Sequence, residues 1–202
     1  MTDEEQTQVA ETAESDPQPD AVSIEELNKT AREHLAQGEW EPAVALYEEV
    51  VAQTEQAGDT AGRAEALNNI ASVYLAVKEW EKALDYASQA RALHQEIGDR
   101  SGEAVTMNNI AAAYDGMGNW DEALAIYEQA LVIRQEAGDL EGEAKTLQNL
   151  AVIHARHGNR PKAKSYLNRA LILARQANSR ALVNTLRKTM SQLPRLRRRI
   201  TQ

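Results

Sequence analysis

A block of 40 residues occurs repeatedly along this chain of 202 residues. Three features return at that interval: an amide-rich stretch, a tryptophan and a Gly-Asp pair. They stand at 68–71, 108–111 and 148–151, at Trp40, Trp80 and Trp120, and at 58–59, 98–99 and 138–139. A period of 20–50 residues indicates an array in which each unit buries its apolar face against its neighbours. The sequence therefore predicts a repeat array rather than one large core.

Each unit is expected to form two helices joined by a tight turn. Alanine, leucine, glutamate and glutamine are abundant and phenylalanine is absent, which favours helix. Ser23 with Glu26 three residues later has the spacing of a capping box, and Gly38 is placed to end the first helix. The predicted helices are 24–37, 40–57, 60–77, 80–97, 100–117 and 120–137, then a helix pair within 140–177 and a last helix over 179–193. Every glycine is interpreted as a helix end.

The predicted organisation has four units, a capping helix and two charged tails. The units are 23–58, 59–98, 99–138 and 139–178, the capping helix is 179–193, and the tails are 1–22 and 194–202. The first tail is acidic, contains Pro17 and Pro19, and is expected to be disordered. It is interpreted as a solubilising segment, with a pseudo-ligand for a basic surface as the alternative. The second tail has four arginines and is interpreted as a solvated end, with acidic lipid, nucleic acid or another copy's acidic tail as alternatives.

Several positions resemble the tetratricopeptide repeat (TPR). They are Leu67, Ile70, Ala71 and Tyr74, then Met107, Ile110, Ala111 and Tyr114 on first helices, and Gly118, Trp120, Ala123, Tyr127 and Ala130 around a second helix. The resemblance covers about residues 23–178. The common TPR form has about 34 residues, and this longer form is similar to Pins-type and kinesin light chain repeats. It implies an all-α, right-handed superhelix with the first helix of every unit lining a concave wall.

The resemblance places a row of side-chain amides on that wall. These are Asn28, Asn68, Asn108 and Gln148, followed one turn later by Arg32, Ser72 and Val152. An amide can donate and accept at once, so the row could clamp the backbone of an extended peptide; a solvated polar face is the alternative. The adjacent Asn69, Asn109 and Asn149 are assigned to packing between units. Arg32, Lys145 and Arg156 are expected to add positive charge.

Other chemistries find little support in the residues. Cysteine is absent, and no catalytic triad, phosphate loop or dinucleotide motif is present. His154 and His157 are three apart, but no carboxylate at matching spacing completes a metal site. We therefore expect no enzyme, no cofactor and no metal. The net charge of −9 argues against general nucleic-acid binding, and no apolar run is long enough for a membrane span.

The predicted function is a non-catalytic scaffold or adaptor in the cytoplasm that binds a partner peptide or protein segment in the concave groove. Two alternatives remain open: a self-associating structural subunit and a regulatory sensor of a short signalling peptide. A peptide sensor should bind one short ligand tightly. A self-associating subunit should change its mass with concentration.

Overall fold

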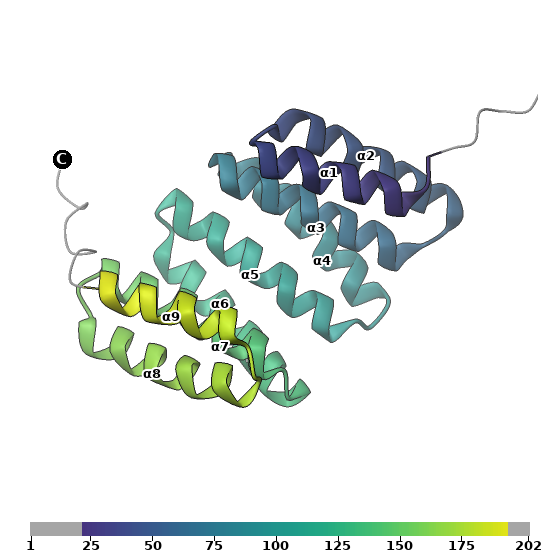
Figure 1. Cartoon of the computed structure of the whole chain (residues 1–202). Helices are drawn as coiled ribbons and strands as arrows, with labels where there is room; N and C mark the ends of the chain where they lie inside the picture. The colour runs from purple at the N-terminus through teal and green to yellow at the C-terminus, as the bar shows by residue number, and fades with distance from the viewer. Residues whose placement is uncertain (1–21, 194–202) are drawn as a thin grey trace, which may run out of the picture.

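The computed structural model describes residues 22–193, and every regular element in that part is an α-helix (Figure 1). The two tails assigned from the sequence lie almost wholly outside the described residues. The helices are α1 Ile24–Gln37, α2 Trp40–Ala57, α3 Thr60–Val77, α4 Trp80–Glu96, α5 Arg100–Met117, α6 Trp120–Ala137, α7 Leu140–Arg156, α8 Arg160–Gln176 and α9 Arg180–Gln192. The predicted helix positions are therefore confirmed to within one residue at each end.

The helices stack in sequence order as an α-solenoid. We call α1, α3, α5 and α7 the A helices and α2, α4, α6 and α8 the B helices. A helices of successive units touch at α3–α5 and α5–α7, and α9 continues this row by touching α7. Among the described helices, no two B helices bring their backbones as close; α2 and α4 are joined instead by side chains, where the Tyr86 hydroxyl donates to Glu48 at 3.0 Å. The units are therefore closer on the A side, and the array curves around the A helices.

Capping interactions explain where the helices begin and end. Ser23 Oγ accepts a hydrogen bond from the Glu26 backbone N–H at 3.2 Å, as expected for an N-cap. Gly38 ends α1 in the left-handed conformation with φ of 80°. Asp59 Oδ1 accepts from the Gly62 N–H at 2.9 Å, and the same bond recurs at the starts of α5 and α7. The Gly-Asp pairs are thus stop and start signals that lie side by side.

Four glycines are not helix ends, so that part of the sequence interpretation is wrong. Gly62, Gly102 and Gly142 lie in the first turns of α3, α5 and α7, and Gly116 lies near the end of α5. Each position needs glycine because a side chain from elsewhere lies too close to leave room for a Cβ atom. A Cβ on Gly102 would stand 2.2 Å from the imidazole ring of His94, and one on Gly116 would stand 2.5 Å from the Trp80 ring.

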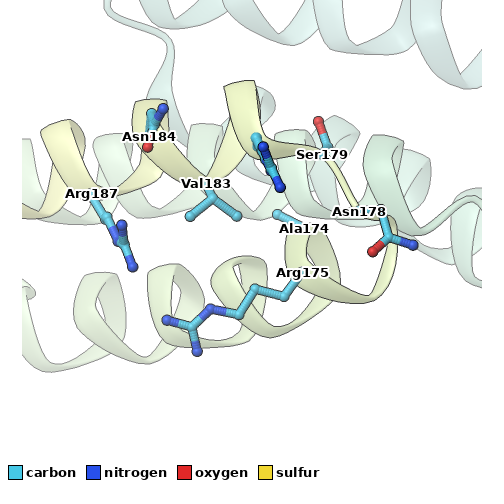
Figure 2. A pocket seen from close by; sticks show the side chains of 8 residues that line it. Ala174, Arg175, Asn178, Ser179, Val183, Asn184 and Arg187 are labelled. Atoms are coloured by element: carbon cyan, nitrogen blue, oxygen red, sulfur yellow. The ribbon is translucent and has the colours of Figure 1, made fainter.

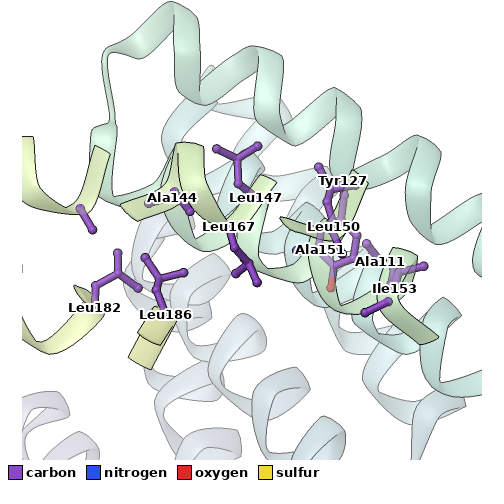
Figure 3. Packing of buried hydrophobic residues seen from close by; sticks show 14 of the residues in the cluster. Ala111, Tyr127, Ala144, Leu147, Leu150, Ala151, Ile153, Leu167, Leu182 and Leu186 are labelled. Atoms are coloured by element: carbon purple, nitrogen blue, oxygen red, sulfur yellow. The ribbon is translucent and has the colours of Figure 1, made fainter. Parts of the chain in front are cut away.

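The core consists of alanine seams between helices and of larger apolar side chains gathered in clusters along the array. Ala71, Ala111 and Ala151 are wholly buried on successive A helices, where a small side chain lets neighbouring helices approach. The largest cluster spans α5 to α9 and contains Leu147, Leu150, Leu167, Leu182 and Leu186 (Figure 3). Separate clusters join α1, α2 and α3. The solenoid therefore has a chain of local cores.

A polar bridge joins each of the B helices α2, α4 and α6 to the A helix that follows. Arg63 Nη1 lies 2.9 Å from Glu55 Oε1. Gln95 donates to Glu103 at 2.6 Å, and Gln135 donates to Glu143 at 3.2 Å. The two positions are 40 residues apart from unit to unit, so the bridge is part of the repeat. We call it the junction bridge.

Candidate peptide-binding groove

A groove of about 630 Å³ lies on the A-helix side, between α5 and α7. Side-chain amides from both helices line it, together with charged residues from α6, from α7 and from the turn between them. The lining residues are Val105, Asn108, Asn109, Arg134, Asp139, Glu141, Gly142, Lys145, Gln148 and Asn149. Two members of the predicted amide row, Asn108 and Gln148, therefore share one surface.

The amides of the predicted row also bond from one unit to the next. Asn108 Nδ2 donates to the Thr146 hydroxyl at 3.2 Å, which connects α5 to α7. Gln148 Nε2 donates to the Thr189 hydroxyl at 2.9 Å, which connects α7 to α9. One N–H of each amide is thus engaged within the solenoid. Each side chain is half-buried, so these bonds hold it in a defined orientation on the wall.

Asn68 and Ser72 are held by the neighbouring unit rather than by the groove. Asn109 Nδ2 donates to Asn68 Oδ1 at 2.8 Å and to the Ser72 hydroxyl at 3.0 Å. This contact confirms the packing role predicted for Asn109. Asn69 and Asn149 make no side-chain hydrogen bond to any other described residue, although both were assigned the same role. Asn149 instead lines the groove.

The remaining predicted site residues lie outside this groove. Asn28 is half-buried and Arg32 is exposed on α1, at the far end of the row from α7. Val152 is half-buried on α7 but is not part of the lining. Arg156 is paired with Asp115 across α5 and α7, so its charge is largely compensated. The structure therefore concentrates the candidate site on the third and fourth units.

Sequence reasoning missed the charged rim of the groove. Arg134 forms an ion pair with Asp139, the N-cap of α7, and both line the groove. Lys145, which was expected to contribute positive charge, lies 2.8 Å from Glu141. The rim thus alternates in sign. The only sequence signal was position: Arg134 occupies the place of Thr54 and His94 in the preceding units.

The histidines of the last unit are engaged by aromatic rings. His154 stacks on Tyr166 with ring centroids 5.6 Å apart, and His157 stacks on Trp120 at 4.5 Å. The His154–Tyr166 pair repeats the stacking of Tyr74 on Tyr86 two units earlier. His154 thus replaces a core tyrosine. Between residues 22 and 193, no three His, Cys, Asp or Glu side chains are grouped so that they could hold a metal.

Replacing His154 with tyrosine is expected to reduce the loss of stability in mild acid. Burial, assisted by the charge of Lys162, lowers the pKa of His154 below the usual histidine value of about 6.5. The unfolded chain then binds the proton more tightly, so stability falls as the pH drops below about 6.5. Thermal melts of wild type and His154→Tyr between pH 7.5 and 5 should diverge in that window, with the variant changing less. Parallel curves would contradict this assignment.

The repeat pattern of the described helices agrees with a family model. The model described as "Tetratricopeptide repeat" matches residues 62–136 and 102–176, together more than half of the chain. This chain belongs to the tetratricopeptide repeat family. No curated protein sequence matches it significantly.

Solved structures with the same fold have low sequence identity to this TPR protein. Aspartyl phosphate phosphatase F from Bacillus subtilis is 13% identical, with a TM-score of 0.74 over 84% of this chain and 45% of its own. A Rap protein complexed with competence and sporulation factor is 18% identical, with a TM-score of 0.73 over 86% and 48%. A protein described as a kinesin light chain from Podosopora anserina, with nearly identical TPR-like repeats, is 18% identical, with a TM-score of 0.61 over 86% and 94%.

The TPR protein spans about half the length of the first two of these structures. At these identities, the likeness concerns the fold alone. Of the nine helices between residues 22 and 193, none has an apolar stretch of the length that a membrane crossing requires.

Proposed function

We propose that this TPR protein is a non-catalytic adaptor of the cytoplasm, and that it binds an extended segment of a partner protein in the groove between α5 and α7. The observation that carries the proposal is the lining of that groove. Four side-chain amides, Asn108, Asn109, Gln148 and Asn149, face one surface from two successive A helices. A peptide in extended form presents backbone N–H and C=O groups at regular intervals, and amides can satisfy both kinds.

The groove also suggests how a partner would be chosen. The pairs Arg134–Asp139 and Lys145–Glu141 place charges of both signs at its rim. Val105 is 40% exposed and supplies an apolar contact. A segment with mixed charge and one apolar anchor would fit this lining better than a uniformly charged one. In this respect the Rap protein is a useful precedent, because that solved neighbour holds a second molecule, competence and sporulation factor.

Removing one amide from each wall is expected to weaken binding by tenfold or more. Asn108→Ala combined with Asn149→Ala removes hydrogen bonds worth about 1 kcal/mol each to the peptide backbone. A displayed library of random peptides, selected on the full chain, provides the ligands. Their affinities for wild type and variant are then compared by fluorescence anisotropy.

A matched control distinguishes the loss of amides in the groove from the loss of two amides elsewhere on the surface. Gln56 and Gln129 are exposed on the B helices α2 and α6, and Gln56→Ala combined with Gln129→Ala should leave affinity unchanged. The Asn108–Thr146 bond is lost in the test variant, so its melting temperature must first be shown to remain near that of wild type. Equal affinities of a folded test variant and wild type would refute the proposed groove.

A further inference from the structure

The charges of this chain are segregated along its length. All 31 acidic residues lie within 1–143, whereas 144–202 contains fourteen of the 22 lysines and arginines and no acid at all. The net charge of −9 conceals this division. In the solenoid, residues from 144 onward form most of α7 and all of α8 and α9. One end of the array is therefore strongly basic while the rest of the chain is acidic.

A groove of about 640 Å³ opens at the basic end, between α8 and α9. Three arginines surround it. Figure 2 shows Val183 between the helices, Arg187 extending from α9 toward α8, and Arg175 lying along α8. The complete lining is Ala174, Arg175, Asn178, Ser179, Arg180, Val183, Asn184 and Arg187. A segment that enters this groove meets cationic side chains and two amides.

The repeat explains why these arginines are uncompensated. The next junction bridge after Gln135–Glu143 would join Arg175 to residue 183, and that residue is valine. The helix-starting aspartate of the other units, such as Asp139, is also replaced, by Ser179. Both carboxylate positions of the repeat are thus neutral in the last unit. Gln95 and Gln135, at the equivalent position of the preceding units, each bond a glutamate, whereas Arg175 has no carboxylate at that place.

No other carboxylate of the folded part takes over this role. Arg156 pairs with Asp115 and Arg169 pairs with Glu143, while Glu141, the acid that bonds Ser179 at the edge of the groove, pairs with Lys145. Within residues 22–193, none of the carboxylates pairs with Arg175, Arg180 or Arg187. A cluster of three unpaired guanidinium groups attracts carboxylates strongly, because each guanidinium can bind one with two parallel hydrogen bonds.

We propose that residues 1–21 of the same chain dock in the α8–α9 groove. This segment carries seven carboxylates and no lysine or arginine, and three of the carboxylates, Asp3, Glu4 and Glu5, lie within its first ten residues. Its charge therefore complements the three arginines, and Asn178 and Asn184 are available to bond its backbone. The other segment outside the described part, 194–202, carries four arginines and is repelled by the same surface. The inference is independent of the peptide groove between α5 and α7.

The segment is long enough to reach its site. Twenty-one extended residues span about 70 Å. The row of first helices from α1 to α9 has four steps of at least about 10 Å each, so the groove is about 40 Å or more from the start of α1. About twelve extended residues bridge that distance, which leaves residues 1–10 to enter the groove. Attachment through the same chain also supplies a high effective concentration, of millimolar order for a short linker. Docking within one chain is therefore favoured over docking between copies.

The docked segment would cover the basic end against acidic partners. The docked segment is bound by charge pairs at a partly exposed surface. High salt should release it, because the Debye length falls to about 3 Å at ~1 M salt. An acidic protein that competes for the arginines would displace it. The groove would then be an acidic-peptide site that the chain itself occupies until a partner arrives.

A paramagnetic label tests this in the full chain. Because the chain has no cysteine, Thr7→Cys, fifteen residues before Val22 and thus within reach of the groove, gives a single attachment point for a nitroxide. Amide signals of Val183 and Asn184 should lose most of their intensity in ¹⁵N spectra at low salt, while signals of α1 and α2 persist. The loss should disappear on reduction of the nitroxide, at high salt, and in Arg175→Glu/Arg180→Glu/Arg187→Glu.

Two further variants make the test specific. Lys29→Glu/Lys78→Glu/Lys82→Glu makes the same change in net charge at exposed sites of the first two units, and it should leave the signal loss intact. Asp3→Asn/Glu4→Gln/Glu5→Gln neutralises the carboxylates that can reach the groove without touching the folded part, and it should abolish the loss even if the arginine variant proves unstable.

Three results would overturn the proposal. Intensity loss only in mixtures of ¹⁵N-labelled and spin-labelled copies means that the segment docks on a second copy. No loss in either sample means that it does not dock. Absence of the loss, together with arginine-dependent binding of a single-stranded DNA oligonucleotide, means that the groove is a nucleic-acid site.

Discussion

Replacing Leu147 with alanine is expected to lower the free energy of unfolding by about 2–5 kcal/mol. Leu147 is wholly buried in the cluster that joins α5 to α9, where it packs with Leu150, Leu167 and Leu182. The substitution removes apolar surface and leaves a cavity that the surrounding helices cannot fill without moving. Urea titration of wild type and variant measures the change.

The position of the damage is as informative as its size. Stability in a solenoid is approximately a sum of local units and their interfaces. Hydrogen exchange should therefore accelerate in α7, α8 and α9 and change little in α1 and α2, which belong to separate clusters. Ile172→Ala, at a side chain 55% exposed, is the matched control and should cost less than about 0.5 kcal/mol. Equal acceleration in all helices would mean that the array unfolds as one unit.

Replacing Gly102 with alanine is expected to destabilise the chain by about 1–2 kcal/mol. Alanine is a better helix former than glycine by about 1 kcal/mol, so propensity alone predicts the opposite sign. The added Cβ, however, would stand 2.2 Å from both the His94 ring and Asp99 Oδ2. It would displace a buried imidazole whose Nδ1 lies 2.9 Å from that carboxylate. Overpacking of this kind costs about 1–3 kcal/mol.

Two comparisons identify the cause of that loss. Gly102→Ala in a His94→Ala background should recover part of the stability, because the ring is gone and only the aspartate still crowds the site. Ser101→Ala, one residue earlier and exposed, should be nearly neutral. If Gly102→Ala raised the midpoint of urea unfolding, helix propensity would outweigh the close approach and the explanation given for these glycines would be wrong.

Helix positions were predictable because their causes are local. Apolar spacing, the Ser23 cap and the Gly-Asp pairs each act within a few residues, and the observed bounds follow them. The exact repeat also made the pairing of helices predictable, since a unit that recurs in sequence must recur in space. The role of Gly62, Gly102 and Gly142 was not predictable in this way. It depends on the side chain of the preceding B helix, such as His94, that folds over the glycine.

The candidate site was predictable only in part. Family resemblance placed Asn108 and Gln148 on the A-helix wall, where both line the groove. It did not indicate that Asn68 is engaged by Asn109, because that bond joins residues 41 positions apart and depends on the angle between α3 and α5. The ion pairs at the rim, Arg134–Asp139 and Lys145–Glu141, likewise depend on how the helices pack. Side-chain contacts between units follow from packing geometry, which the spacing of residues along one chain does not contain.

The sequence by itself determined an all-α array with a 40-residue period, the ends of its helices and the segregation of its charges, since each of these is a property of residues close together in the chain. The tertiary structure alone decided which amides share a groove and which glycines are needed for close approach. It also decided that Arg175 faces Val183 where other units have a polar pair. The physical reason is the stacking of units, which brings residues about 40 positions apart into contact and places Val183 and Ser179, rather than carboxylates, beside the arginines of the last helix pair.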